Sequence, residues 1–227
     1  MIKHFRSRLP HAYGALGAWG KAVMFSLVTL PVAADEITIA ALGDSLTAGY
    51  GLVSDEGFVP QLQAWLDARD HDVRVINAGV SGDTTAGGLA RATWTLTPEV
   101  DAMILALGGN DFLRGIDPAV SRANLAGILE EAAAAEVAVL LVGIVSSGNY
   151  GPEYRDAFNA MYPDLANEYG TLLDPDFFNG FREVVAEGAL LSDFMLRDGI
   201  HPNAAGVALI VETLGPQVEA LLERVAE

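Results

Sequence analysis

The chain of 227 residues contains no cysteine. Disulfide bonds and cysteine-ligated zinc or iron–sulfur sites are therefore excluded, although a cysteine-free protein fits the cytosol and an exported location equally well. Basic residues are also few. Thirteen lysines and arginines stand against 30 aspartates and glutamates, which gives a net charge of −17. Nucleic acid and anionic membranes would not attract such a chain, so we expect neither as its main partner.

The apolar segment near the N-terminus, residues 22–34, is too short to span a membrane. It has 13 residues, whereas a spanning helix needs about 20. The stretch before it has no acidic residue and four basic ones: Lys3, Arg6, Arg8 and Lys21. The basic start, the apolar core and the small residues at its end are typical of a secretory signal peptide.

We therefore predict that residues 1–34 are removed by cleavage before Asp35, and that residues 35–227 form the mature protein. The alternative is a membrane anchor. Losing four positive charges and no negative ones would take the net charge from −17 to −21. The prediction is an acidic protein in the periplasm or the medium, without stable membrane insertion.

Past Asp35 the chain alternates between apolar runs and helical patterns. The runs are continuous, as in parallel strands covered on both faces: Ile37–Leu42, Val73–Ala78, Ala102–Leu107, Val137–Val145 and a weaker Thr171–Asp174. Alternation of this kind predicts one doubly wound, flavodoxin-like α/β sandwich with about five parallel strands and helices on both faces. There is no linker, internal repeat or low-complexity tract, so residues 35–227 are expected to form a single domain.

Helices are expected between these runs. One is predicted from about Val59 to Ala68, and a second is marked by apolar residues spaced i, i+3, i+4, i+7 from Leu125. The last begins at Ala204 after an Asn203 cap. Gly215-Pro216 is expected to kink or split it, because proline removes a backbone donor and clashes with the preceding turn.

Small polar residues follow the first three runs, and a further polar loop precedes the last helix. The segments are Gly43-Asp44-Ser45-Leu46, Ser81-Gly82-Asp83, Gly108-Gly109-Asn110-Asp111 and Asp198–Asn203. Ligands of open α/β sheets bind beyond the carboxyl ends of the strands, where these loops should converge. Ser45 is well placed there to act as a nucleophile. The simpler interpretation is a serine that only caps a helix. It is less favoured because three other polar loops are expected at the same edge of the sheet.

Histidine is scarce, which narrows the choice of a base. Two of the four histidines, His4 and His11, lie in the predicted signal peptide, and His71 stands between two aspartates, where we expect it to be solvated. His201 is left as the candidate base, with Asp198 three residues earlier as its orienting partner. The alternative is a turn-capping aspartate beside a surface histidine.

Together the four loops resemble the SGNH, or GDSL-type, hydrolases, and their order and spacing match along the whole mature chain. The likeness is greatest to small bacterial periplasmic esterases described as acyl-CoA thioesterase I, lysophospholipase or arylesterase. A joint match of four blocks is far more specific than the Gly-Asp-Ser-Leu tetrapeptide alone. The larger α/β-hydrolase fold is disfavoured, because the chain has no Gly-x-Ser-x-Gly elbow.

The resemblance implies a serine hydrolase that cleaves acyl esters, thioesters or lysophospholipids without a cofactor or metal. It makes Ser45 the nucleophile, His201 the general base and Asp198 its partner. The oxyanion hole would combine the backbone N–H groups of Ser45 and Gly82 with the side-chain amide of Asn110. Gly79 lies in the same second loop, and Gly82 is preferred because its Ser-Gly-Asp context matches the family.

Residues for substrate binding are less sharply indicated. Asp44, Phe112 and Leu113 are the expected contacts near the nucleophile. Seven apolar residues before the last loop are candidates for an acyl groove, and they could equally belong to the core: Phe177, Phe178, Phe181, Leu190, Leu191, Phe194 and Met195. We expect a monomer that acts on a small acyl ester.

Two other function classes remain open at this point. The first alternative is a metallophosphoesterase, because Gly-Asp and Gly-Gly-Asn-Asp superficially resemble metal-binding loops. A two-metal site normally requires several histidines and carboxylates, and the predicted mature chain has only one suitable histidine, His201. A non-catalytic ester- or glycan-binding module on the same scaffold is the second alternative, although such a module has no need for an activated serine.

Overall fold

The computed structural model describes residues 36–226. The predicted signal peptide at residues 1–34 and the cleavage before Asp35 lie outside the described residues and stay predictions.

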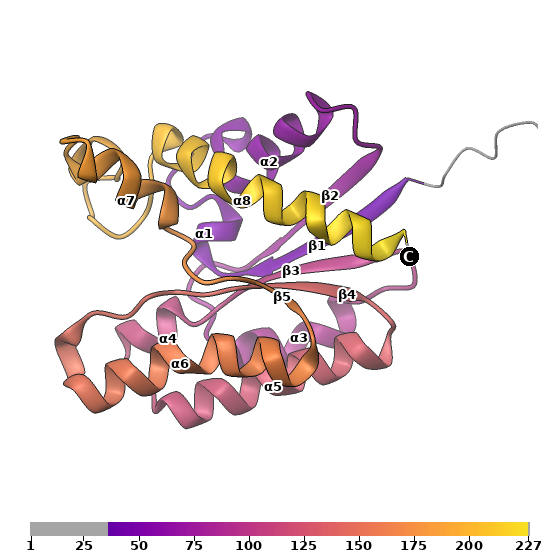
Figure 1. Cartoon of the computed structure of the whole chain (residues 1–227), viewed down its shortest axis with the longest axis horizontal. Helices are drawn as coiled ribbons and strands as arrows, with labels where there is room; N and C mark the ends of the chain where they lie inside the picture. Colours follow the sequence, from indigo (N-terminus) through magenta and orange to yellow (C-terminus); the bar gives the residue numbers. More distant parts are fainter. Residues whose placement is uncertain (1–35, 227) are drawn as a thin grey trace, which may run out of the picture. The chain divides into compact units, whose positions relative to one another are not determined.

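The described residues form a three-layer α/β structure around one parallel sheet (Figure 1). Its strands are β1 (Ile37–Gly43), β2 (Val73–Gly79), β3 (Ala102–Ala106), β4 (Ala138–Val142) and β5 (Leu172–Asp174). They pair in the order β2-β1-β3-β4-β5, and every pair is parallel. The predicted fold class is confirmed. After β1 and β2, the chain returns to the other side of β1 and adds the remaining strands in the opposite direction across the sheet. In sheets of this kind, ligands bind in the crevice at this switch point, between the carboxyl ends of β1 and β3.

The inner strands are mostly apolar because helices cover both faces of the sheet, whereas the edge strand β2 carries Arg74 and Asn77 and is largely part-exposed. All five residues of β3 are buried, and in β1 only Ile37 is partly exposed. The expected fourth run, Val137–Val145, is longer than the strand it contains. Its last three residues, Gly143–Val145, leave the sheet and enter the loops beyond its carboxyl edge.

Helices α2 and α8 pack side by side on one face, while α3, α5 and α6 cover the other (Figure 1). The helices are α1 (Ser45–Ala48), α2 (Phe58–Asp67), α3 (Thr85–Thr95), α4 (Gly109–Leu113), α5 (Pro118–Ala134), α6 (Pro152–Tyr169), α7 (Asn179–Ala186) and α8 (Ala204–Val225). Short 3₁₀ turns occupy Ser54–Glu56, Gly148–Tyr150 and Leu191–Asp193. The predicted Asn203 cap of α8 is present, since its side chain accepts a hydrogen bond from the Gly206 N–H.

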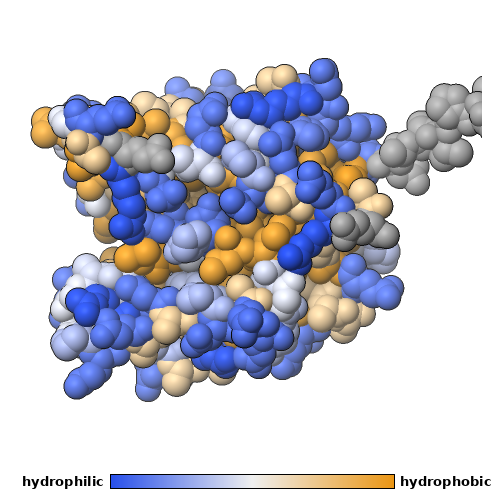
Figure 2. All heavy atoms as spheres, viewed as in Figure 1, coloured by the Kyte–Doolittle hydropathy of each residue, from blue (hydrophilic) through white to orange (hydrophobic). Residues whose placement is uncertain are grey.

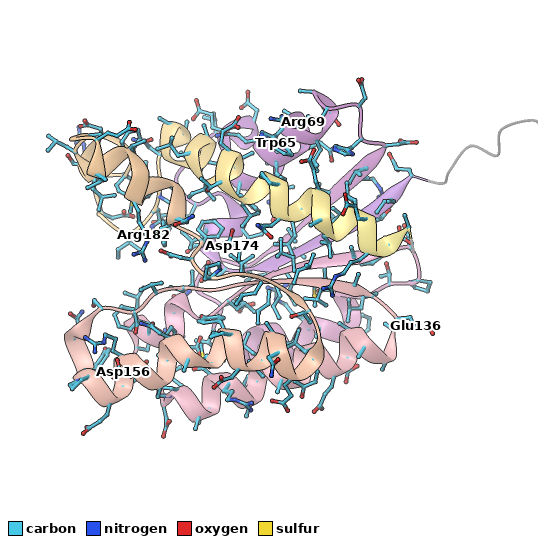
Figure 3. All side chains as sticks on the ribbon, viewed as in Figure 1. Trp65, Arg69, Glu136, Asp156, Asp174 and Arg182 are labelled. Carbon is cyan, nitrogen blue, oxygen red and sulfur yellow. The ribbon has the colours of Figure 1, made fainter. Side chains whose placement is uncertain are left out.

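Gly215-Pro216 is expected to kink or split the last helix. The split is wrong, because α8 runs unbroken for 22 residues, and the kink stays a prediction. Pro216 lies on the exposed side of α8, where water can satisfy the carbonyl group that loses its partner. Gly215 lies where Trp65 of α2 packs, and a Cβ there would come within 2.6 Å of the indole ring. Arg69 covers the same ring, with its guanidinium carbon 3.4 Å from the centroid (Figure 3). The glycine therefore serves close helix packing.

The expectation that His71 is solvated holds only in part. Its Nε2 atom lies 2.8 Å from an Oε1 atom of Glu219 on α8, and the two side chains are only 31% and 38% exposed. The partner is 148 residues away in the sequence, so the flanking aspartates gave no sign of it.

Candidate active site

Ser45 follows β1 directly and is the first residue of α1. Asp44 caps this short helix, because its carboxylate accepts a hydrogen bond of 3.0 Å from the backbone N–H of Leu46. The Ser45 residue is 9% exposed. Strand and cap together fix the hydroxyl at the carboxyl edge of the sheet, facing the loops that follow the other strands.

His201 reaches Ser45 from the loop before α8. Its Nε2 atom lies 2.8 Å from Ser45 Oγ, and its Nδ1 atom lies 2.7 Å from an Oδ2 atom of Asp198. The second carboxylate oxygen of Asp198 accepts hydrogen bonds from the backbone N–H groups of Ile200 and His201. The aspartate therefore caps a tight turn and contacts the imidazole at the same time, and the histidine is not the surface residue of the alternative interpretation, since its side chain is 15% exposed.

These contacts decide the charge of the Asp198 carboxyl group. The hydrogen bond from His201, followed by the two backbone N–H groups, lowers the pKa of Asp198 to about 2. Asp198 thus stays a carboxylate across the physiological range and can stabilise a protonated imidazole. The ring of Tyr50 covers the same imidazole, with the two ring centroids 4.5 Å apart.

Asn110 lies in α4, directly after β3. The turn into this helix needs glycine at Gly108, where φ is +122° and where a side chain would collide with the hydroxyl group of Tyr162. The amide Nδ2 of Asn110 donates to an Oδ2 atom of Asp44 at 3.2 Å. Because an amide nitrogen has two hydrogens, one remains to donate into the space in front of Ser45.

Gly82 lies in a tight turn after β2. The Asp83 N–H donates to the carbonyl oxygen of Val80 at 3.0 Å, and φ at Gly82 is +86°, as the third position of a type II turn requires. Within the described residues the Gly82 N–H has no hydrogen-bond partner. Gly79, in contrast, lies within β2 and donates its N–H to the side chain of Asn77. This geometry favours Gly82 over Gly79 as a donor.

Ser45, Gly82, Asn110 and His201 line one cavity of about 410 Å³. Figure 2 shows the molecule hollowed on this side, between α7 and the start of α6, with hydrophobic residues inside the hollow. The segments that follow four strands, which include α1 and α4, and the loop before α8 supply its apolar lining: Leu46, Phe112, Leu113, Ile144, Val145, Phe178 and Ile200. The arrangement places the Ser45 hydroxyl, in contact with an imidazole, beside polar groups and an apolar wall.

Comparison with known proteins agrees with this geometry. The model of the GDSL-like Lipase/Acylhydrolase family matches residues 41–209. The chain belongs to this family. Esterase TesA of Pseudomonas aeruginosa is 40% identical over 198 residues, which make up 87% of this chain and 95% of that protein.

Two further similar proteins support this GDSL-like hydrolase assignment. Thioesterase 1/protease 1/lysophospholipase L1 of Escherichia coli is 35% identical over 205 residues, 90% of this chain and 94% of that one. A crystal structure of the psychrotrophic esterase EstA from Pseudoalteromonas sp., inhibited by monoethylphosphonate, has a TM-score of 0.74 and 33% identity. It covers 82% of this chain and 98% of that one.

The GDSL-like hydrolase has a second apolar cavity beside the first, also of about 410 Å³, and the two share Phe178 and Ile200. Four of the seven candidate groove residues line it: Phe178, Phe181, Leu191 and Met195. Phe177 is core instead, 2% exposed and packed on Phe58 with the ring centroids 5.5 Å apart. Leu190 and Phe194 line neither of these two cavities.

The sequence reasoning missed Ile144 and Val145, which follow β4 and line the first cavity. A signal for them existed. The run that predicted the fourth strand extends three residues past Val142, and the excess had to leave the sheet at the same carboxyl edge as the other loops. Tyr50, which packs on His201, lies only five residues after Ser45 and carried no such signal.

The three predicted substrate contacts, Asp44, Phe112 and Leu113, all line the first cavity. Asp44 is only 3% exposed, and its two oxygens accept hydrogen bonds from Leu46 and Asn110. Burial raises the pKa of Asp44 from 3.8 to about 6, and the two hydrogen bonds and the nearby His201 only partly oppose this shift.

The raised pKa of Asp44 predicts a pH-dependent change in stability. The folded state holds this proton more tightly than the unfolded state. Asp44 therefore contributes stability below about pH 4, which is lost as the pH rises through 6. About two pKa units correspond to about 3 kcal/mol. The Asp44→Asn side chain carries no charge at either pH. The free energy of unfolding of Asp44→Asn, minus that of wild type, should therefore be about 3 kcal/mol higher at pH 7.5 than at pH 4.

Urea unfolding of both proteins at the two pH values measures this difference. The matched control is Asp156→Asn, since Asp156 is a 67% exposed carboxylate on α6 (Figure 3), and it should show no such change between the two pH values. A free-energy difference between Asp44→Asn and wild type that is the same at pH 4 and pH 7.5 would contradict the prediction.

Proposed function

We propose that the protein is a serine esterase that cleaves carboxylic acyl esters through an acyl-enzyme on Ser45. Acyl thioesters, aryl esters and lysophospholipids belong to the proposed substrate class. The observation that carries the proposal is the unbroken chain of short contacts from Ser45 through His201 to Asp198, 2.8 Å and 2.7 Å, beside an apolar cavity.

In the proposed mechanism His201 Nε2 removes the hydroxyl proton as Ser45 Oγ attacks the substrate carbonyl carbon. The carbonyl π electrons move to the oxygen and form a tetrahedral intermediate. Its collapse expels the alkoxide or thiolate, which takes the proton from His201, and leaves an ester on Ser45. A water molecule then gives a proton to the same imidazole and attacks the ester carbon. The bond between this carbon and Ser45 Oγ breaks, His201 returns the proton to Oγ, and the carboxylic acid leaves.

Negative charge on the carbonyl oxygen is the main barrier to this chemistry, and fixed donors lower it. Ser45 and Gly82 would supply backbone N–H groups, and Asn110 its side-chain amide. A neutral amide suits this place because it cannot take the serine proton. The carboxylate of Asp44 would act indirectly, by holding the Asn110 amide through the 3.2 Å hydrogen bond.

The apolar linings of the two neighbouring cavities support an acyl chain as the bound group, with Phe112 and Leu113 lining the first cavity and Phe178 lining both. The names of the relatives, an esterase and a thioesterase/lysophospholipase, agree with this substrate class. We infer that a phosphonate ester would react with Ser45, because the similar esterase EstA is inhibited by monoethylphosphonate.

The metallophosphoesterase and the binding module are weaker alternatives. Membership in a lipase and acylhydrolase family favours ester hydrolysis over both. In the described part of the chain, no group of three or more His, Asp or Glu side chains is arranged to hold a metal ion. Independence from a metal, the monomeric state, and a location in the periplasm or the medium stay predictions.

The test is a panel of p-nitrophenyl esters with acetyl, octanoyl and palmitoyl chains, assayed before and after prolonged treatment with a chelator. We expect hydrolysis that chelation leaves unchanged, and a kcat/KM that depends on chain length because methylene groups enter the apolar cavities. A loss of activity that a divalent ion restores would favour the metallophosphoesterase instead. Binding of the esters without turnover would favour the binding module.

A further inference from the structure

Arg91 of α3 lies behind the proposed oxyanion hole and joins three separate segments. Its Nη2 atom donates to the carbonyl oxygen of Gly43 at 2.8 Å, and its Nη1 atom donates to that of Ala78 at 2.6 Å. Its Nε atom donates to an Oδ2 atom of Asp83 at 2.7 Å. The Arg91 side chain is only 21% exposed and that of Asp83 19%. Three acceptors on one planar guanidinium group fix its position.

The segments that Arg91 joins are those that carry the two backbone donors. Gly43 stands two residues before Ser45, and Asp83 stands directly after Gly82. The β1–β2 ladder ends at the pair Gly43 and Gly79, so it does not extend to either donor. Beyond the ladder, the guanidinium group and one hydrogen bond from the Val80 N–H to the carbonyl oxygen of Gly43 link these segments.

The residues around Asp83 leave room for its contact with Arg91. At Gly87 of α3 a side chain would collide with the Asp83 carboxylate, so glycine lets the carboxylate lie close to the helix that carries Arg91. On the exposed side, Arg114 donates to the carbonyl oxygen of Gly82 at 2.8 Å. The loop segment Gly82-Asp83 is thus held from two sides, by Arg114 at the Gly82 carbonyl group and by Arg91 at the Asp83 carboxylate, and Arg91 is the less exposed of the two.

We propose that Arg91 is a positioning residue that sets the distance and direction between the Ser45 and Gly82 N–H groups. This inference rests on the proposed function. A hydrogen bond to the oxyanion forms fully only in the transition state, so a misplaced donor lowers kcat and leaves KM nearly unchanged. A displacement of about 1 Å can cost about a hundredfold.

Arg91→Lys tests this, because an ammonium group on a flexible stem cannot reach three acceptors in one plane. We expect kcat to fall by about tenfold to a hundredfold while KM stays within about threefold. The matched control is Arg122→Lys, since Arg122 of α5 pairs with Glu168 at the surface, and it should behave as wild type. Titration of reactive serines with a p-nitrophenyl phosphonate gives kcat per folded active site.

A purely structural role would lower the number of titratable sites and the melting temperature and leave kcat per site unchanged. That result would overturn the inference, as would a wild-type kcat in a folded Arg91→Lys protein. If Arg91→Lys does not fold, Asp83→Asn removes the charge from one of the three acceptors and should lower kcat per site severalfold. A wild-type kcat in that variant would also overturn the inference.

The same assays separate this inference from the proposed function. If wild type does not hydrolyse the esters, or Ser45→Ala still does, the serine mechanism fails whatever Arg91 does. If wild type is active, Ser45→Ala is inactive and Arg91→Lys equals wild type per site, only the role of Arg91 is refuted.

Discussion

Replacing Ser45 with alanine should reduce ester hydrolysis by at least about 10⁴-fold, because the nucleophile of the acyl-enzyme is lost and only binding and the oxyanion donors remain. Turnover of p-nitrophenyl octanoate measures this loss. A p-nitrophenyl phosphonate should add its phosphonyl group to wild type and not to Ser45→Ala, which mass spectrometry detects.

Stability should change little in Ser45→Ala. The side chain makes one hydrogen bond, to His201, and a bond of this kind contributes about 1 kcal/mol. Circular dichroism and the melting temperature of the same preparation check the fold. Ser54→Ala, a serine at the exposed 3₁₀ turn Ser54–Glu56, is the matched control and should keep full activity. Hydrolysis within tenfold of wild type in folded Ser45→Ala would remove Ser45 from the nucleophile role.

The sequence was sufficient for the fold because its main signal is local. Parallel strands covered on both faces have continuous apolar sequences, and each of the five runs overlaps one strand of the sheet, with β1 and β2 ending one residue beyond their runs. The turn between Asp198 and His201 is also local, since the carboxylate bonds to backbone groups two and three residues later. The turn directly precedes α8, and the packing of α8 on the parallel sheet brings it to the carboxyl edge where Ser45 lies.

Features that depend on distant partners could not be predicted in this way. Gly215 leaves the space in which Trp65 of another helix packs, and His71 pairs with Glu219 on α8. The three acceptors of Arg91 are 8, 13 and 48 residues away from it in the sequence, and only the folded chain brings them to one guanidinium group. The order of residues in the sequence indicates helix and strand propensity and periodicity. It does not indicate which side chains of different helices and strands will be in contact.

The largest effect expected after Ser45 concerns Asn110. If its amide donates to the oxyanion, Asn110→Ala should lower kcat by about 10² to 10³-fold, or about 3–4 kcal/mol, and leave KM nearly unchanged. Asn110→Asp should be at least as damaging, because a carboxylate would repel the developing negative charge. In Asn110→Asp the new carboxylate would also face Asp44, whose oxygen lies 3.2 Å from the present amide nitrogen.

Stability and catalysis must be separated in these variants, because Asn110 also holds Asp44. Removing the amide leaves a buried carboxylate with one partner fewer, which should cost about 1–3 kcal/mol at neutral pH. Asn124→Ala is the matched control, since the Asn124 amide donates to the hydroxyl group of Thr85 and that bond forms no part of the cavity lining. It should lower the melting temperature without changing kcat per titrated site. If Asn110→Ala behaves in the same way, with an unchanged kcat per site, Asn110 supports the turn after β3 and donates nothing to the oxyanion.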